Sequence, residues 1–100
     1  ACTMVVGAIV RAGATLHCFA LHFTPDGRLA GHRGKLKPTA AERLIWGEGG
    51  PDDVLVFDSP VGRIAPVICW ENFMPLFRAA LYQQGVTIWA APTVDDRPQW

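Results

Sequence analysis

Cys69 stands where a strand-like run gives way to a helical pattern, and it is the residue in this chain best placed for nucleophilic chemistry. The preceding residues, 64–68, form an apolar run typical of a buried strand. Beyond the cysteine, Asn72 is predicted to cap a helix that Gly85 ends. A cysteine at such a turn faces the positive end of the helix, which favours the thiolate. We therefore predict that Cys69 is a catalytic nucleophile.

A second group of candidate residues lies in a charged segment punctuated by glycine and proline, residues 31–51. Most lysines are solvated surface groups, but a fixed ammonium at Lys35 would stabilise a thiolate and the negative charge on an attacked substrate. Glu42 fits either a surface ion pair or a carboxylate that orients Lys35. Glu71 fits either a cap or a simple complement to the helix dipole. Residue types alone leave these roles open.

The remaining cysteines and histidines fit structural roles better than a metal site or a disulfide framework. Cys2 and Cys18 lie within strand patterns, and three cysteines without a C-x-x-C spacing favour free thiols in a reducing, cytoplasmic setting. His17 and His22 are five residues apart on one strand, a spacing that favours packing histidines with satisfied hydrogen bonds. His32 is expected to be a solvated loop residue. We expect neither a metal nor a cofactor.

Composition restricts the class of protein. Half of the 100 residues are hydrophobic, and the net charge is zero, with nine basic and nine acidic residues. This balance lacks the basic surface that nucleic acid or an anionic membrane requires. No apolar run approaches the roughly 20 residues of a membrane-spanning helix, and no signal peptide is evident. So high a hydrophobic content in so short a chain predicts apolar faces that are covered by elements outside it.

The chain predicts an α/β fold with a mixed β-sheet. The expected strands are residues 3–11, 15–23, 28–30, 54–57, 63–68 and 86–90, with turns at 12–14, 24–27 and 59–62. The helix before the last strand predicts a right-handed βαβ crossover. Both faces of strand 15–23 are apolar, so we expect it to be covered on both sides. Residues 31–51 are expected to be a loop with one helical turn at 40–44, capped by Thr39, and loops of this length are usually functional.

Several motifs closely resemble, in order and spacing, those of the nitrilase family of carbon–nitrogen hydrolases. They are Lys35-Leu36-Lys37-Pro38-Thr39, Glu42-Arg43, Trp46-Gly47-Glu48-Gly49, Gly62-Arg63-Ile64, Ile68-Cys69-Trp70-Glu71-Asn72, Met74-Pro75-Leu76 and Ala91-Pro92-Thr93-Val94-Asp95. The resemblance covers essentially the whole chain. Cys69-Trp70-Glu71 looks like the nitrile-hydrolysing branch of the superfamily. Gly34 departs from the family, which commonly carries a basic residue next to the lysine.

The resemblance implies a four-layer α-β-β-α sandwich and a Glu-Lys-Cys triad. Cys69 would be the nucleophile, Lys35 the triad lysine that stabilises charge, and Glu42 an additional active-site carboxylate. Trp70 and Glu71 would lie near the oxyanion and the substrate. The general-base glutamate of the triad normally lies well upstream of the lysine, so residues 1–100 are expected to be the central portion of a single hydrolase domain without its N-terminal and C-terminal parts.

The implied activity is hydrolysis of a nitrile to a carboxylic acid and ammonia by a full-length, homo-oligomeric enzyme with a small-molecule nitrile as its partner. An amidase or a cyanide hydratase with the same triad is the nearest alternative, and Trp70 favours nitriles. A non-catalytic α/β module for binding or assembly is the alternative from another class. The 100-residue chain by itself is expected to be inactive.

Overall fold

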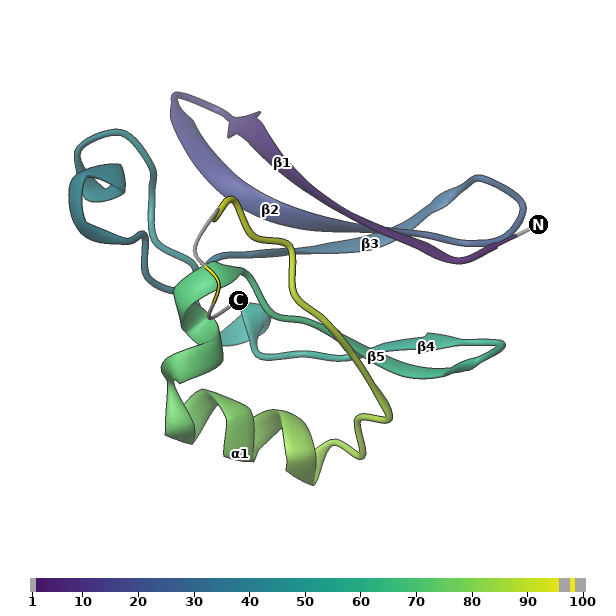
Figure 1. The fold of residues 1–100 in the computed structure, drawn as a ribbon. Helices are drawn as coiled ribbons and strands as arrows, with labels where there is room; N and C mark the ends of the chain where they lie inside the picture. The colour runs from purple at the N-terminus through teal and green to yellow at the C-terminus, as the bar shows by residue number, and fades with distance from the viewer. Residues whose placement is uncertain (1, 96–97, 99–100) are drawn as a thin grey trace.

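Two three-stranded sheets and one α-helix make up the described part of the chain. The computed structural model describes residues 2–95 and 98. The first sheet has the order β1 (Met4–Ala12), β2 (Thr15–Phe23), β3 (Leu29–Gly34), and the second has the order β4 (Phe57–Ser59), β5 (Gly62–Pro66), β6 (Ile88–Ala90). Figure 1 shows the first sheet, the second sheet and helix α1 (Pro75–Gln83) as successive layers. This is a β-β-α part of the predicted four-layer sandwich.

The first sheet is an antiparallel meander, as predicted. A two-residue turn at Gly13, with φ at +62°, joins β1 to β2, and Ala12 pairs with Thr15 beside it. The second turn closes when Gly27 donates its N–H to the carbonyl of Thr24, at 2.8 Å.

The prediction was wrong where it ended the third strand at residue 30. Strand β3 continues to Gly34 because residues 31–34 pair with β2. His32 is therefore an exposed strand residue, stacked on Phe19 with 4.8 Å between ring centroids, rather than a loop residue.

The second sheet confirms the βαβ crossover. Strands β4 and β5 form an antiparallel hairpin, and β5 runs parallel to β6 with α1 between them in the chain. The prediction of a strand at 54–57 was wrong except at its last residue. A 3-10 turn, Pro51–Asp53, occupies the chain just before it, and Val54 donates to the carbonyl of Pro51 instead of pairing with a strand.

Helix α1 begins later than predicted. Pro75 is its first residue and Met74 its N-cap, whereas Cys69–Phe73 form a separate 3-10 turn. Proline is favoured at this position because the N–H that it lacks would have no hydrogen-bond partner in the first turn of a helix. Asn72 therefore caps no helix. The predicted end is confirmed, since Gly85 follows the last turn with φ at +74°.

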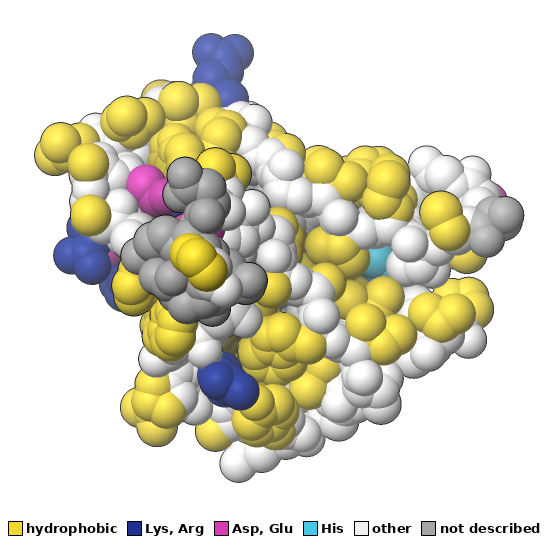
Figure 2. All heavy atoms as spheres, in the orientation of Figure 1, with side chains coloured by type: hydrophobic (Ala, Val, Ile, Leu, Met, Phe, Trp, Pro, Cys, Tyr) yellow, Lys and Arg dark blue, Asp and Glu magenta, His cyan; other side chains and the backbone are white. Residues whose placement is uncertain are grey.

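The hydrophobic core lies between the second sheet and α1. Its buried members are Ala65 and Val67 from the strand side and Phe77 and Leu81 from the helix. Phe73 lies four residues before Phe77, a spacing that would place both on one face of a continuous helix, but it belongs to the 3-10 turn and is 62% exposed. Figure 2 shows many hydrophobic side chains on the surface as well. None of the helices in residues 2–95 has the length and apolar character that crossing a membrane requires.

His22 lies between the two sheets, and its environment differs from the prediction. Its ring is 1% exposed and stacks on Phe57 at 4.8 Å, but neither ring nitrogen has a hydrogen-bond partner in the described structure. The expectation of a satisfied packing histidine was therefore wrong. Burial lowers the pKa of His22 below its ordinary value of 6.5, because the charged form is poorly solvated there.

This histidine predicts a loss of stability in mild acid. Below pH 6.5 the unfolded state binds a proton that folded His22 takes up only at lower pH. The free energy of unfolding should therefore fall as the pH drops below 6.5, by at most about 1.4 kcal/mol per pH unit. Urea unfolding of the full-length wild type and of His22→Phe between pH 7.5 and 5 checks this. Equal pH slopes for the two proteins would contradict it.

Candidate active site

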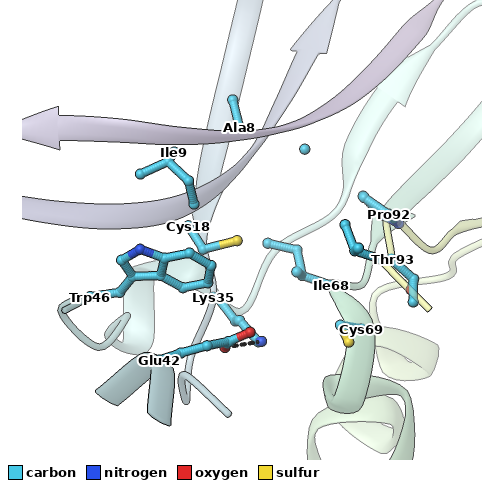
Figure 3. A pocket seen from close by; sticks show the side chains of 12 residues that line it. Ala8, Ile9, Cys18, Lys35, Glu42, Trp46, Ile68, Cys69, Pro92 and Thr93 are labelled. Carbon is cyan, nitrogen blue, oxygen red and sulfur yellow. Dashed lines mark hydrogen bonds and ion pairs between the residues drawn. The ribbon is translucent and has the colours of Figure 1, made fainter. Parts of the chain in front are cut away.

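A cavity of about 450 Å³ brings three of the predicted site residues together. Its lining comes from strands β1 and β2 of the first sheet and from the segments that follow β3, β5 and β6, and consists of Gly7, Ala8, Ile9, Cys18, Lys35, Glu42, Trp46, Ile68, Cys69, Pro92, Thr93 and Val94. Figure 3 shows Lys35, Glu42 and Cys69 on one side of this space and Ala8 and Ile9, on strand β1, across from them. Cys69, Lys35 and Glu42 thus share one cavity although they lie on different segments.

The backbone at Cys69 is strained. Its φ is +52°, in the left-handed region that non-glycine residues rarely adopt. A conformation of this kind costs about 1–3 kcal/mol and persists only where the surroundings impose it. Here the N–H of Cys69 donates to the carbonyl of Pro92 at 3.0 Å, and the N–H of Val67 donates to Ala90 at 2.7 Å. These two bonds tie residues 67–69 to β6 and to the segment that follows it. The chain turns sharply at Cys69, and the cysteine lines the cavity.

Lys35 is a buried lysine with fixed partners rather than a surface lysine. It is 2% exposed, and its Nζ donates to Glu42 Oε2 at 2.6 Å and to Thr39 Oγ1 at 2.9 Å. Its backbone is held too, because its N–H donates to Cys18 and its carbonyl accepts from Gly49, both at 2.8 Å. The ammonium is therefore held in one place at the wall of the cavity.

Glu42 acts on Lys35 as an ionised carboxylate. It lies in the 3-10 turn Ala40–Leu44, the predicted helical turn, and its Oε2 also accepts from the N–H of Thr39 at 2.6 Å. Burial raises the pKa of Glu42, but the hydrogen bonds from Lys35 and Thr39 outweigh it, so the pKa lies below its ordinary value of 4.5. The geometry favours the orienting role over a surface ion pair.

Trp70 and Glu71 follow the cysteine, but neither side chain is part of the cavity lining. Trp70 is 44% exposed, and its ring lies against Phe73 with 5.0 Å between centroids. Glu71 is 1% exposed and pairs with Arg33. It also caps the start of the 3-10 turn, because its Oε2 accepts from the N–H of Ile68 at 2.8 Å.

Among the lining residues without a predicted site role, Cys18 and Thr93 bring a thiol and a hydroxyl to the cavity. Burial is the main cause that raises the pKa of the Cys18 thiol above its ordinary value, so this thiol stays protonated and is a weak nucleophile. The hydroxyl of Thr93 is buried and has no hydrogen-bond partner in the described part of the chain. Cys18 was expected to have a structural role, since its strand pattern gives no sign of a cavity. Thr93 carried one signal, its place in a motif shared with the nitrilase family.

No group of three or more His, Cys, Asp or Glu residues within the described ranges is arranged to hold a metal ion. The three cysteines are free thiols, with Cys2 exposed and the other two half-buried. The reactive and charged groups that line the cavity are two thiols, an ammonium and a carboxylate, with the hydroxyl of Thr93 beside them.

Comparison with known proteins identifies the class of protein to which this fold and cavity belong. The family model for carbon–nitrogen hydrolase matches residues 1–100, so the chain belongs to the carbon–nitrogen hydrolase family. Among curated relatives, an aliphatic nitrilase of Sinorhizobium fredii and a bifunctional nitrilase/nitrile hydratase of Oryza sativa are each 52% identical over 97 residues. Nitrilase 2 of Arabidopsis thaliana is 47% identical over the same length. The resemblance to nitrilases is confirmed.

These alignments include 97% of the chain but only 31%, 27% and 29% of the three relatives, so the chain spans under a third of their length. Solved structures show the same fold. A carbon–nitrogen hydrolase of Helicobacter pylori superimposes with a TM-score of 0.81 at 20% identity, over 97% of this chain and 36% of that one. A glutamine-dependent NAD+ synthetase of Acinetobacter baumannii gives 0.80 at 19% identity, over 95% and 18%.

Proposed function

We propose that residues 1–100 are the central portion of a single carbon–nitrogen hydrolase domain, and that the full-length protein hydrolyses nitriles to carboxylic acids and ammonia. The observation that carries the proposal is the shared cavity of Cys69, Lys35 and Glu42. The names of the relatives, which are nitrilases over nearly the whole chain, support nitriles as the substrate class.

The proposed reaction begins when a base removes the proton of the Cys69 thiol and the sulfur attacks the nitrile carbon. The nitrile nitrogen takes up a proton, and the product is a thioimidate. Water adds to its carbon, the C–N bond breaks and ammonia leaves, so an acyl thioester remains on the sulfur. A second water releases the carboxylic acid and restores the thiol. The base is a glutamate in the part of the domain outside this chain.

Lys35 and Glu42 have different electrostatic roles in this proposal. Lys35 places a positive charge beside the tetrahedral species, where a preorganised charge stabilises the transition state most. Glu42 stays ionised and holds the ammonium in place through the 2.6 Å contact. The buried hydroxyl of Thr93 lies in the same cavity and has no partner among the residues that the structure describes, so it is suited to a hydrogen bond with the substrate.

Formation of an amide is the second candidate outcome. The thioimidate hydrate has two leaving groups, and loss of the Cys69 sulfur instead of ammonia gives the amide. One relative at 52% identity is named a bifunctional nitrilase/nitrile hydratase, which favours this branch over an amidase that begins from an amide. Product identity separates the outcomes.

The test uses the full reading frame that contains this chain. The purified protein is given a panel of aliphatic and aromatic nitriles, and ammonia, acid and amide are measured, with Cys69→Ala as the control. Acid plus ammonia, lost in the variant, would support the nitrilase. Amide as sole product would make it a hydratase. Turnover of amides alone would indicate an amidase, and no turnover with a Cys69 inert to thiol reagents would favour a non-catalytic module.

Two further parts of the proposal concern assembly and compartment. We expect the full-length protein to be a homo-oligomer and to work in a reducing, cytoplasmic setting, where the thiol of Cys69 stays free.

The isolated 100-residue chain should be inactive because it lacks the general base. Nitrile hydrolysis by the isolated chain that depends on Cys69 would overturn this expectation.

Lys35→Met is expected to lower kcat/KM for nitriles by about 10²- to 10³-fold, because it removes the charge that stabilises the tetrahedral species. Lys37→Met is a matched control in the same loop. Lys37 pairs with Glu48 and is 55% exposed, so its loss should change the rate little. Steady-state kinetics of both variants check the prediction, and equal losses would show that the loop rather than the Lys35 ammonium matters.

A further inference from the structure

A buried ion pair joins Arg33, two residues before Lys35, to Glu71, two residues after Cys69. Both side chains have no exposed surface, and the two groups meet as parallel forks. Arg33 Nη1 donates to Glu71 Oε2 and Nη2 to Oε1, each at 2.6 Å. Bidentate contacts of this kind fix orientation as well as distance.

The carboxylate of Glu71 also binds the backbone beside both site residues. Its Oε1 accepts from the N–H of Leu36 at 2.7 Å, next to Lys35, and its Oε2 accepts from the N–H of Ile68 at 2.8 Å, next to Cys69. One carboxylate therefore joins the Lys35–Leu36 peptide to the Val67–Ile68 peptide, which lies one residue before the cysteine.

All five N–H groups of Arg33 have acceptors. Besides the two on Glu71, they are the carbonyls of Asp53 (2.9 Å), Pro66 (2.8 Å) and Gly34 (2.8 Å). The guanidinium also lies over the ring of Phe77, 5.0 Å from its centroid. Only arginine carries five donors in a fixed plane, so lysine cannot reproduce this set.

We propose that Arg33 and Glu71 are positioning residues that fix the Lys35 ammonium relative to the Cys69 thiol. A buried ion pair contributes little net stability compared with an apolar pair of the same size. What this pair provides is geometry, since each partner stands two residues from a site residue. The Glu71 carboxylate binds the N–H groups of Leu36 and Ile68, the neighbours of Lys35 and Cys69 in the chain. Arg33 also neutralises Glu71, so that its negative charge does not oppose the thiolate. The inference rests on the proposed function.

The test is Glu71→Asp in the full-length protein, which keeps the charge but shortens the side chain by about 1.5 Å. The shorter carboxylate cannot reach both amides at once. We expect kcat per folded molecule to fall by about 10- to 100-fold with KM changed far less, because misplacing reacting groups by about 1 Å costs rate rather than ground-state binding. Arg33→Lys is measured in the same way, and it takes the place of Glu71→Asp as the test if that variant does not fold.

Leu81→Ala is the matched control for stability. Leu81 is fully buried in the core and makes none of these contacts, so its truncation should destabilise by about 2–5 kcal/mol. Assayed well below its melting temperature, it should keep its kcat per folded molecule. If the pair is merely structural, Glu71→Asp will behave in the same way, and a kcat within twofold of the wild type would overturn the proposal.

A second readout separates this inference from the proposed function. The rate at which iodoacetamide modifies Cys69, measured at one pH with Cys2 and Cys18 replaced by serine, requires no nitrile turnover. We expect Glu71→Asp to slow this rate by about tenfold, because the ammonium no longer stays beside the thiolate. An unchanged rate would refute the positioning role even in a protein that hydrolyses no nitrile.

Discussion

Full-length protein with Cys69→Ala is expected to hydrolyse nitriles at least about 10⁴-fold more slowly than the wild type, since the loss of a covalent nucleophile removes the whole reaction path. Its stability should change by no more than about 1 kcal/mol, because alanine adopts the same backbone at a similar cost. Kinetics with a sensitive ammonia assay, together with thermal unfolding, measure both quantities.

Cys18→Ser and Cys69→Gly are the informative companions. Cys18 lines the same cavity but its thiol stays protonated, so Cys18→Ser should keep most of the activity. Cys69→Gly should be as inactive as Cys69→Ala. Its free energy of unfolding should equal that of the alanine variant or exceed it by up to about 1 kcal/mol, because glycine accepts the φ of +52° without strain. Activity retained by Cys69→Ala, or lost equally with Cys18→Ser, would contradict the assignment of the nucleophile.

Arg33→Met is expected to destabilise the protein by about 3–5 kcal/mol, because it leaves the charge of Glu71 buried without its partner. Urea unfolding of the full-length protein measures the loss. The double variant Arg33→Met with Glu71→Leu should recover much of it, since it removes both charges together.

Arg63→Met is the control for Arg33→Met. Arg63 pairs with Asp58 at 2.9 Å, but the two side chains are 45% and 84% exposed, so its loss should cost within about 1 kcal/mol. If Arg33→Met costs no more than Arg63→Met, the buried pair is not held as tightly as its contacts indicate.

The sequence was sufficient for the features that depend on local pattern. Strand 15–23 and the end of the helix at Gly85 were predicted and are confirmed. The strand–helix–strand order around Cys69 is confirmed as well. Each rests on spacing or turn chemistry between neighbours in the chain. The strained backbone at Cys69 was not predicted, because it is imposed by a hydrogen bond to Pro92, 23 residues away.

The sequence was insufficient where partners are distant. Arg33 looked like one of several charges in a polar loop. Glu71 fitted a cap or a complement to the helix dipole, and it does cap the 3-10 turn, but its pairing with Arg33 was missed because a fully buried pair of charges is uncommon. Their pairing spans 38 residues. Asn72 was wrongly predicted to cap the helix. Its side-chain nitrogen donates to the carbonyls of Val67 and Cys69, and its side-chain oxygen accepts from the indole N–H of Trp89.

The Arg33–Glu71 pair has a consequence for protein engineering. Residues 33–36 and 68–71 are bonded to each other through this pair, so a chimera that takes one segment from a homologue should take the other as well. Random libraries aimed at new substrates are better placed at Ala8 and Ile9, which line the cavity from strand β1. Those positions lie across from the cysteine and the lysine (Figure 3), where the cavity can be reshaped without disturbing the pair that holds them.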